Sequence, residues 1–118
     1  MSRVLVCGGR DYTNFEQVDR VLDLLAKVEP IEVIIQGGAT GADALAKSYA
    51  EEKGIPSITE EADWTTHGVA AGPIRNTAMI KKHKPTIIIA FPGGKGTANM
   101  VKQGRMNKIK VIEIEDNR

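Results

Sequence analysis

The chain alternates short segments rich in Val and Ile with segments whose apolar residues recur every three or four positions. The first kind is typical of buried strands, and the second is typical of amphipathic helices. Strict alternation needs crossover connections, which build a parallel sheet with helices on both faces. We therefore predict a doubly wound α/β fold with a five-stranded, mainly parallel sheet in the order 3-2-1-4-5. The expected strands are residues 3–7, 31–36, 55–60, 86–91 and 109–114.

One interval does not fit this alternation. Residues 61–72 read EADWTTHGVAAG, which is too polar for an amphipathic helix and longer than a minimal connection between a helix and a strand. Long loops inside compact domains are more often functional than idle. Trp64, the only tryptophan, lies here and could stack on a base, close a pocket or simply pack against the domain.

Length and composition limit the class of protein. The 118 residues fit one domain spanning 1–118, with 42% hydrophobic residues to form its core. No apolar run approaches the roughly 20 residues of a membrane span, and the first residues lack a signal-peptide pattern, so we expect a cytoplasmic protein without a membrane partner. Cys7 is the only cysteine, and His67 and His83 lack the spacing of metal ligands. We therefore expect no disulfide within the chain, no metal and no cofactor.

Glycine clusters follow three of the predicted strands. They read CGGRD at 7–11, QGGATGAD at 36–43 and FPGGKGT at 91–97. The carboxyl ends of parallel strands meet at one edge of the sheet, where ligands bind in open α/β folds. Glycine lets the backbone approach a ligand closely, and a following helix presents free N–H groups and the positive end of its dipole. The three clusters predict an anion site, most plausibly for phosphate, although each cluster could also be only a tight turn.

Common nucleotide motifs do not account for these clusters. The chain has no G-x-x-x-x-G-K-[ST] sequence, and GKGTAN at 94–99 falls one residue short of G-x-G-x-x-G and precedes the last strand. Arg10 and Arg75 could hold a phosphate, whereas Asp11 and Asp43 could cap helices or bind ribose hydroxyls. The residues expected to contact the ligand are Gly8, Gly9, Arg10, Asp11, Gly38, Ala39, Thr40, Gly41, Asp43, Trp64, Arg75, Asn76, Pro92, Gly93, Gly94, Lys95, Gly96 and Thr97.

Several of these motifs resemble a known family. PGGKGT at 92–97 is similar to the PGGxGT signature of the LOG phosphoribohydrolases, and AGPIRNTAM at 71–79 resembles their arginine-containing helix start. The whole chain resembles the small, stand-alone, YspA-like members of the SLOG superfamily. The resemblance implies a Rossmann-like fold that binds nucleotides or nucleotide-derived ligands. Other SLOG domains sense NAD-derived signals such as cyclic ADP-ribose isomers, and a related domain of the DNA-uptake protein DprA binds single-stranded DNA.

The chain departs from the LOG pattern at one position. LOG enzymes read PGGxGTxxE, and Met100 stands where their catalytic glutamate would be. A thioether cannot transfer a proton, whereas phosphate binding by the glycine-rich segment needs no carboxylate. The resemblance therefore favours binding without hydrolysis, although Asp11, Asp43 or Asp63 could supply a substitute acid.

Three classes of function follow. The first is a module that binds a nucleotide-derived ligand, such as ADP-ribose or a cyclic isomer, to sense or sequester it. The second is a LOG-like N-glycosidase, and the third is a DprA-like binder of single-stranded nucleic acid. The net charge of +1 and the aromatic content of 4% make nucleic acid an unlikely partner. Because LOG-like proteins complete their pocket with a neighbouring subunit, and because two helices carry methionines, we expect a homodimer or homotetramer.

Overall fold

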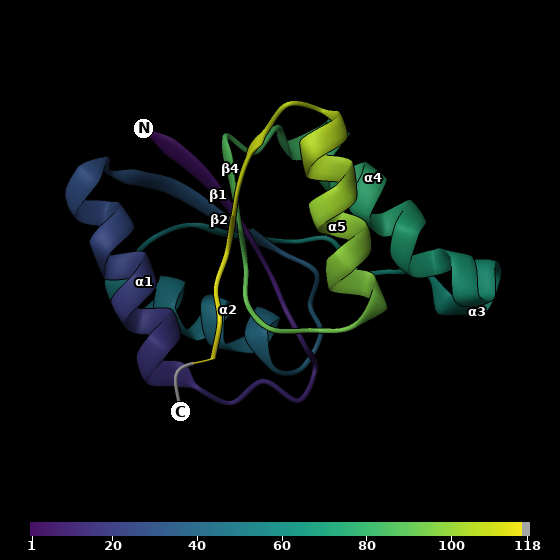
Figure 1. The fold of residues 1–118 in the computed structure, drawn as a ribbon, viewed down its shortest axis with the longest axis horizontal. Coiled ribbons are helices and arrows are strands. Elements are labelled where there is room, and N and C mark those ends of the chain that lie inside the picture. Colours follow the sequence, from purple (N-terminus) through teal and green to yellow (C-terminus); the bar gives the residue numbers. More distant parts are fainter. Residues whose placement is uncertain (117–118) are drawn as a thin grey trace.

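The computed structural model describes residues 1–116, which form a five-stranded sheet with helices on both faces (Figure 1). Every pair of neighbouring strands is parallel, and their order is β3-β2-β1-β4-β5, which confirms the predicted topology. β1 and β4 lie side by side at the centre, where the winding direction reverses. The strands are β1 (Ser2–Cys7), β2 (Ile31–Gln36), β3 (Ser57–Thr59), β4 (Ile87–Ala90) and β5 (Lys110–Glu113).

Four long helices cover the two faces of the sheet. Helices α1 (Phe15–Val28) and α2 (Ala42–Lys53) lie on one face, and α4 (Ala71–His83) and α5 (Lys95–Met106) lie on the other (Figure 1). This arrangement follows from the crossovers, because α1 and α2 connect strands on one side of β1, whereas α4 and α5 lead to β4 and β5 on its other side.

Alternating side chains of the central strand enter two separate core layers. Val4 and Val6 pack with α1 and α2, whereas Leu5 and Cys7 pack with α4 and α5. Both faces of β1 are therefore buried, which explains why its sequence reads as a continuous apolar run. Met100 of α5 belongs to the second layer and has 0% of its surface exposed.

The interval that we expected to be an irregular loop is largely helical. It contains α3 (Trp64–His67) and a 3-10 turn, η1 (Gly68–Ala70), and α4 follows directly. The carboxylate of Asp63 caps α3 by accepting the backbone N–H of Thr66, with N···O 3.1 Å. Our prediction was wrong because four residues are too few to show helical periodicity. Together α3 and η1 form the end of the molecule farthest from α1 (Figure 1).

Two further observations concern membrane spans and metal sites. Within residues 1–116, no helix has both the length and the apolar character needed to cross a bilayer. The same residues contain no group of three His, Cys, Asp or Glu side chains that could hold a metal ion.

Candidate functional site

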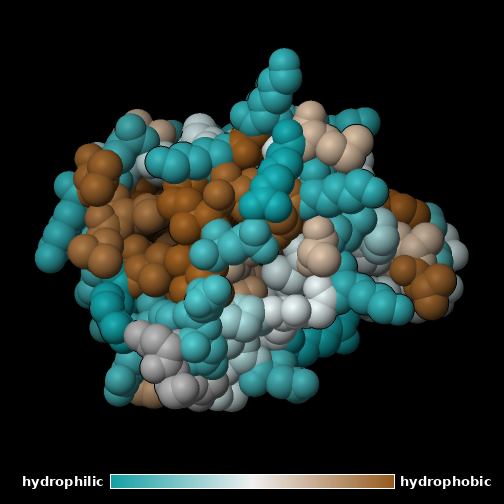
Figure 2. All heavy atoms as spheres, in the orientation of Figure 1, coloured by the Kyte–Doolittle hydropathy of each residue, from teal (hydrophilic) through white to brown (hydrophobic). Residues whose placement is uncertain are grey.

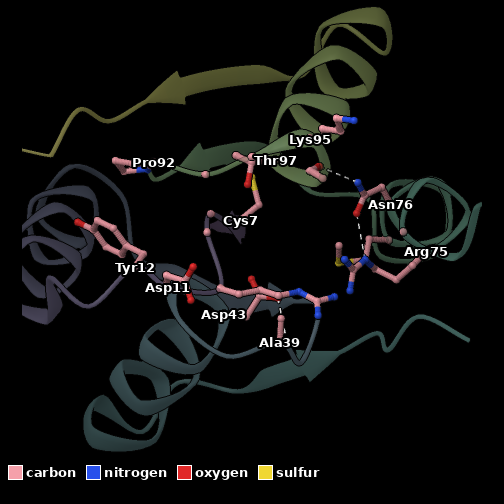
Figure 3. Close-up of a pocket in the computed structure, with 18 of the residues that line it drawn as sticks. Cys7, Asp11, Tyr12, Ala39, Asp43, Arg75, Asn76, Pro92, Lys95 and Thr97 are labelled. Atoms are coloured by element: carbon pink, nitrogen blue, oxygen red, sulfur yellow. Dashed lines mark hydrogen bonds between the residues drawn. The ribbon is translucent and has the colours of Figure 1, made fainter. Parts of the chain in front are cut away.

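The loops that follow β1 and β4 touch each other at the carboxyl edge of the sheet. The backbone N–H of Gly9 donates to the carbonyl oxygen of Pro92, with N···O 2.8 Å. A cavity of about 650 Å³ opens between these loops and the starts of α2, α4 and α5 (Figure 3). Its volume lies within the range of sites that bind small molecules and cofactors.

Several glycines in this region are required by contact between the loops. A Cβ atom on Gly93 would collide with Thr97 Oγ1 and lie 2.7 Å from the backbone nitrogen of Gly9. Gly41 has a φ of +74°, and a Cβ there would lie 2.6 Å from the carbonyl carbon of Arg10. These glycines let three loops approach backbone to backbone. Their presence is therefore explained by packing, without any ligand.

Gly94 and Gly96 have a different environment. Both line the cavity, and a Cβ atom on either would meet no other atom within 4 Å. Gly94 is the N-cap of α5 and supplies no side-chain cap for the first turn of that helix. The unpaired N–H groups of a helix start carry a partial positive charge that attracts anions. The start of α5 is therefore open towards the cavity and suited to an anion.

The second glycine cluster uses its N–H groups within the protein. At the start of α2, the N–H of Ala42 donates to the carbonyl of Gly9, with N···O 3.1 Å. In the preceding loop, the N–H of Gly38 donates to Oε1 of the buried Gln36, with N···O 2.6 Å. The three glycine clusters are therefore not equivalent, and only the third combines open glycines with an uncapped helix start.

Arg75, from the first turns of α4, reaches into the cavity across from α5 (Figure 3). Its Nη1 donates to the carbonyl of Gly37, and its Nε donates to Oδ1 of Asn76, both at 3.0 Å. Asn76 in turn donates through Nδ2 to the carbonyl of Gly96, with N···O 3.2 Å. This chain of bonds fixes the guanidinium relative to the start of α5. Burial lowers the pKa of Arg75, and the charge of Asp43 counteracts part of this shift.

Asp43 brings a buried carboxyl group to the same cavity. Only 6% of its surface is exposed, and its Oδ2 accepts the N–H of Ala39, with N···O 3.2 Å. Burial raises the pKa of Asp43, while the bond from Ala39 and the charge of Arg75 act in the opposite direction. The cavity therefore contains a carboxyl group that takes up a proton more readily than an ordinary aspartate.

Trp64 and Arg10 form one wall of the cavity. The guanidinium carbon of Arg10 lies 5.3 Å from the centre of the Trp64 ring, within the range of a cation–π contact. The ring also lies against Gly72 of α4, and 47% of the Trp64 surface remains exposed. Both residues also line a second pocket of about 410 Å³ beyond this wall.

The structure brings most of the predicted binding residues together. Gly38 and Thr40 line only the second pocket, and Gly41 lines neither because it packs against the loop after β1. The others line the main cavity: Gly8, Gly9, Arg10, Asp11, Ala39, Asp43, Trp64, Arg75, Asn76, Pro92, Gly93, Gly94, Lys95, Gly96 and Thr97.

Five further residues line the cavity that we had not expected to contact the ligand: Cys7, Tyr12, Gly72, Met79 and Asp116. Tyr12 stacks on Phe91 with ring centres 5.4 Å apart, which anchors the loop after β1. Because Tyr12 directly follows the GGRD turn, its place in the sequence could have indicated that it lines the cavity. Asp116 gave no such signal, because only the path of the chain after β5 carries it there. Burial raises the pKa of Cys7 to about 12, so its thiol is not an activated nucleophile.

The structure also narrows the candidates for a catalytic acid. Met100 lies in the core and does not line the cavity. Asp63 caps α3 and lines neither pocket, which contradicts its place among the substitute acids. Asp11 and Asp43 both line the cavity. Of the substitute acids expected from the sequence, Asp11 and Asp43 therefore remain, and Asp116 adds a third carboxyl group to the cavity.

Two comparisons with known proteins found relatives of the chain. Residues 2–67, which contain β1 to β3, match the family described as "YspA, cpYpsA-related SLOG family". The chain is also 34% identical over 125 aligned positions to the Gene 61 protein of Mycobacterium phage D29, and the alignment covers 98% of each chain.

Proposed function

The chain belongs to the YspA, cpYpsA-related SLOG family, and on this basis we propose that it binds a nucleotide-derived ligand in the main cavity. The phosphate would lie at the start of α5, against Gly94 and Gly96. The protein would then act by sensing or sequestering this ligand.

The open start of α5 is the observation that carries this proposal. Gly94 and Gly96 leave space where any side chain would intrude, and no side chain caps the helix. The guanidinium of Arg75 is held in the same cavity by two hydrogen bonds that leave other N–H groups of its fork unused. Backbone N–H groups, a helix dipole and a fixed positive charge are the features that proteins use to hold phosphate.

The rest of the cavity suits a ligand larger than phosphate. Its volume of about 650 Å³ leaves room for a ribose and a base. The Trp64 ring offers a surface on which a base could stack, and Asp11 and Asp43 offer acceptors for ribose hydroxyls. ADP-ribose and its cyclic isomers combine all of these groups.

Isothermal titration calorimetry with inorganic phosphate, AMP, ADP, ADP-ribose and cyclic ADP-ribose tests the proposal. We expect the Gly94→Val variant to fold normally, because the new side chain enters open space, and to lose binding by occupying the phosphate position. Circular dichroism checks the fold. If none of these ligands bound the wild type, or if Gly94→Val kept full affinity, the proposal would be wrong.

A second candidate function is cleavage of an N-glycosidic bond in the same ligand. The buried carboxyl group of Asp43, with its raised pKa, is the observation that favours it, because a protonated carboxyl can donate to a leaving base. Chromatography of nucleotides after incubation with the protein would detect a released base. The activity should be absent in Asp43→Asn if Asp43 is the proton donor.

A further inference from the structure

The second pocket, of about 410 Å³, shares a boundary with the main cavity. The residues that line both spaces are Arg10, Ala39, Trp64 and Arg75. The residues that line only the second pocket are Gly37, Gly38, Thr40, Glu61 and Ala62. The two spaces are therefore neighbours, and the side chains at their boundary decide whether one ligand can occupy both.

Two guanidinium groups meet at this boundary. Arg75 donates to the carbonyl of Gly37, which lines the second pocket, and to Asn76, which lines the main cavity. Burial lowers the pKa of Arg75, the charge of Asp43 counteracts this, and the charge of Arg10 lowers it further, so the two guanidinium groups lie close together. Within residues 1–116, neither of them forms an ion pair with a carboxylate. The boundary therefore has positive charge that a phosphate would neutralise.

The side chain of Arg10 forms a partition that is weakly held. Arg10 is exposed, and its guanidinium carbon lies 5.3 Å from the centre of the Trp64 ring. Among the residues that the structure describes, none holds this side chain by a hydrogen bond or an ion pair. A cation–π contact at an exposed site is weak. An anion beside Arg10 would therefore compete with the ring for the guanidinium and open a passage between the two spaces.

The second pocket has a different character beyond this boundary. Glu61 is exposed, and its Cγ would lie 3.1 Å from a Cβ atom on Gly38. Its carboxylate forms no hydrogen bond or ion pair with any residue from 1 to 116. A carboxylate repels phosphate but accepts hydrogen bonds from the hydroxyls of a sugar. This pocket therefore suits an uncharged group that carries hydroxyls.

The surface around the two spaces also favours a polar ligand. Figure 2 shows the largest group of apolar side chains between α1 and β5, whereas the edge at which β1 and β4 end is mostly pale or teal. Trp64 is the one large apolar side chain among the residues that line the second pocket. A ligand there is therefore held mainly by hydrogen bonds and charge.

We propose that the second pocket binds a second sugar, which a diphosphate joins to the nucleotide in the main cavity. This binding rests on the proposed function, because the ligand extends from the phosphate at the start of α5. Asn76 connects the two charged positions, since it donates to the carbonyl of Gly96 and accepts from Arg75. The next phosphate lies between Arg10 and Arg75, and the hydroxyls of the second sugar reach Glu61. The ligand is then a nucleoside diphosphate with a sugar on its terminal phosphate.

ADP and ADP-ribose differ by the second sugar, so calorimetry with both ligands isolates the second pocket. We expect the wild type to bind ADP-ribose about tenfold more tightly than ADP. Glu61→Ala should weaken ADP-ribose by about tenfold, through loss of a hydrogen bond to a charged group, and should not weaken ADP. Glu51→Ala is the matched control, because Glu51 is also an exposed glutamate but belongs to α2 and lines neither pocket. It should leave both affinities within about twofold of wild type.

The outcomes separate the second-sugar site from the function on which it rests. If the wild type bound ADP but bound ADP-ribose no more tightly, the second pocket would not hold a sugar, although the main cavity would still bind a nucleotide. The same would follow if Glu61→Ala, with its fold checked by circular dichroism, did not weaken ADP-ribose more than ADP. If neither ligand bound the wild type, the proposed function and the second-sugar site would both be wrong.

AMP tests the place of the second phosphate, because AMP carries only the first. Arg10→Gln should weaken ADP-ribose by about tenfold and AMP by less than about threefold. Arg20→Gln is the matched control, since Arg20 is an exposed arginine of α1 that lines neither pocket. It should leave both affinities unchanged. Equal losses for AMP and ADP-ribose in Arg10→Gln, or no loss for ADP-ribose, would overturn this arrangement of the phosphates.

Discussion

Helix α5 contains two glycines for which the same substitution should have opposite effects. Gly96 lies in its first turn at the edge of the cavity, and Gly104 lies two turns later over the sheet. A Cβ atom on Gly96 would meet nothing within 4 Å. On Gly104 it would lie 2.5 Å from Cδ1 of Ile88 and 3.0 Å from Cγ2 of Val111. Alanine therefore fits at the first position and overpacks the core at the second.

The expected magnitudes follow from these distances. In a helix, Ala is more stable than Gly by about 0.5–1 kcal/mol, so Gly96→Ala should stabilise the protein by that amount. Gly104→Ala gains the same helix propensity, but overpacking of a close-packed core costs about 1–3 kcal/mol. The free energies of unfolding of the two variants should therefore differ by roughly 1–3 kcal/mol, with Gly96→Ala the more stable.

The two variants should rank in the opposite order for ligand affinity. The methyl group of Gly96→Ala would enter the proposed phosphate position and should weaken the binding of ADP-ribose by about tenfold or more, a loss of roughly 1.4 kcal/mol. Gly104→Ala should leave affinity unchanged, because Gly104 does not line the cavity. Gly96 therefore lowers the stability of the protein but keeps the cavity open. A binding function would require such a trade of stability for an open site.

Urea denaturation measures the stability of both variants, and calorimetry measures their affinity. A Gly96→Ala variant that is less stable than wild type would show that the start of α5 is not open as described. A Gly96→Ala variant with unchanged affinity for a ligand that the wild type binds would refute the proposed position of the phosphate.

Three further predictions concern the cavity and the core. Arg75→Lys keeps the charge but loses the planar fork, so calorimetry should show phosphate-containing ligands binding about tenfold more weakly. The pKa of Asp43 is raised, so its charged form lowers the free energy of unfolding at neutral pH. This cost disappears as the pH falls through that pKa, because the folded protein then takes up a proton. Asp43→Asn should therefore be more stable than the wild type at pH 7 and should lose this advantage in acid, as urea denaturation at several pH values would show. Met100→Glu would restore the LOG pattern but would bury a carboxylate in the core, so we expect its free energy of unfolding to fall by at least about 3 kcal/mol.

The order of the strands could be predicted because alternation and right-handed crossovers leave few arrangements. The bounds of β2 were also predicted correctly, since this strand is paired on both sides. β3 is shorter than predicted, with Ser57–Thr59 in place of 55–60. It lies at the edge of the sheet, where only β2 offers hydrogen-bond partners.

The roles of the individual glycines could not be predicted from the sequence. Gly93 and Gly94 are neighbours, yet a Cβ on the first would strike another loop and a Cβ on the second would enter open space. The difference depends on how closely segments far apart in the chain approach, which no local pattern contains. Met100 is a similar case, because the helix face that looks into the cavity in the first turn of α5 lies over the sheet one turn later.

The methionines suggested a surface for a partner, and the structure separates them into two groups. Met79 and Met100 are both buried in the core, whereas Met106, in the last turn of α5, is 72% exposed.

In the LOG arrangement a neighbouring subunit completes the pocket. If subunits of this protein share the cavity in the same way, ligand binding and subunit association are linked reciprocally, so ADP-ribose should strengthen association by the same factor as association strengthens binding. Sedimentation velocity at several protein concentrations, with and without ADP-ribose, measures this factor. An association constant that ADP-ribose leaves unchanged would show that a single chain holds the ligand.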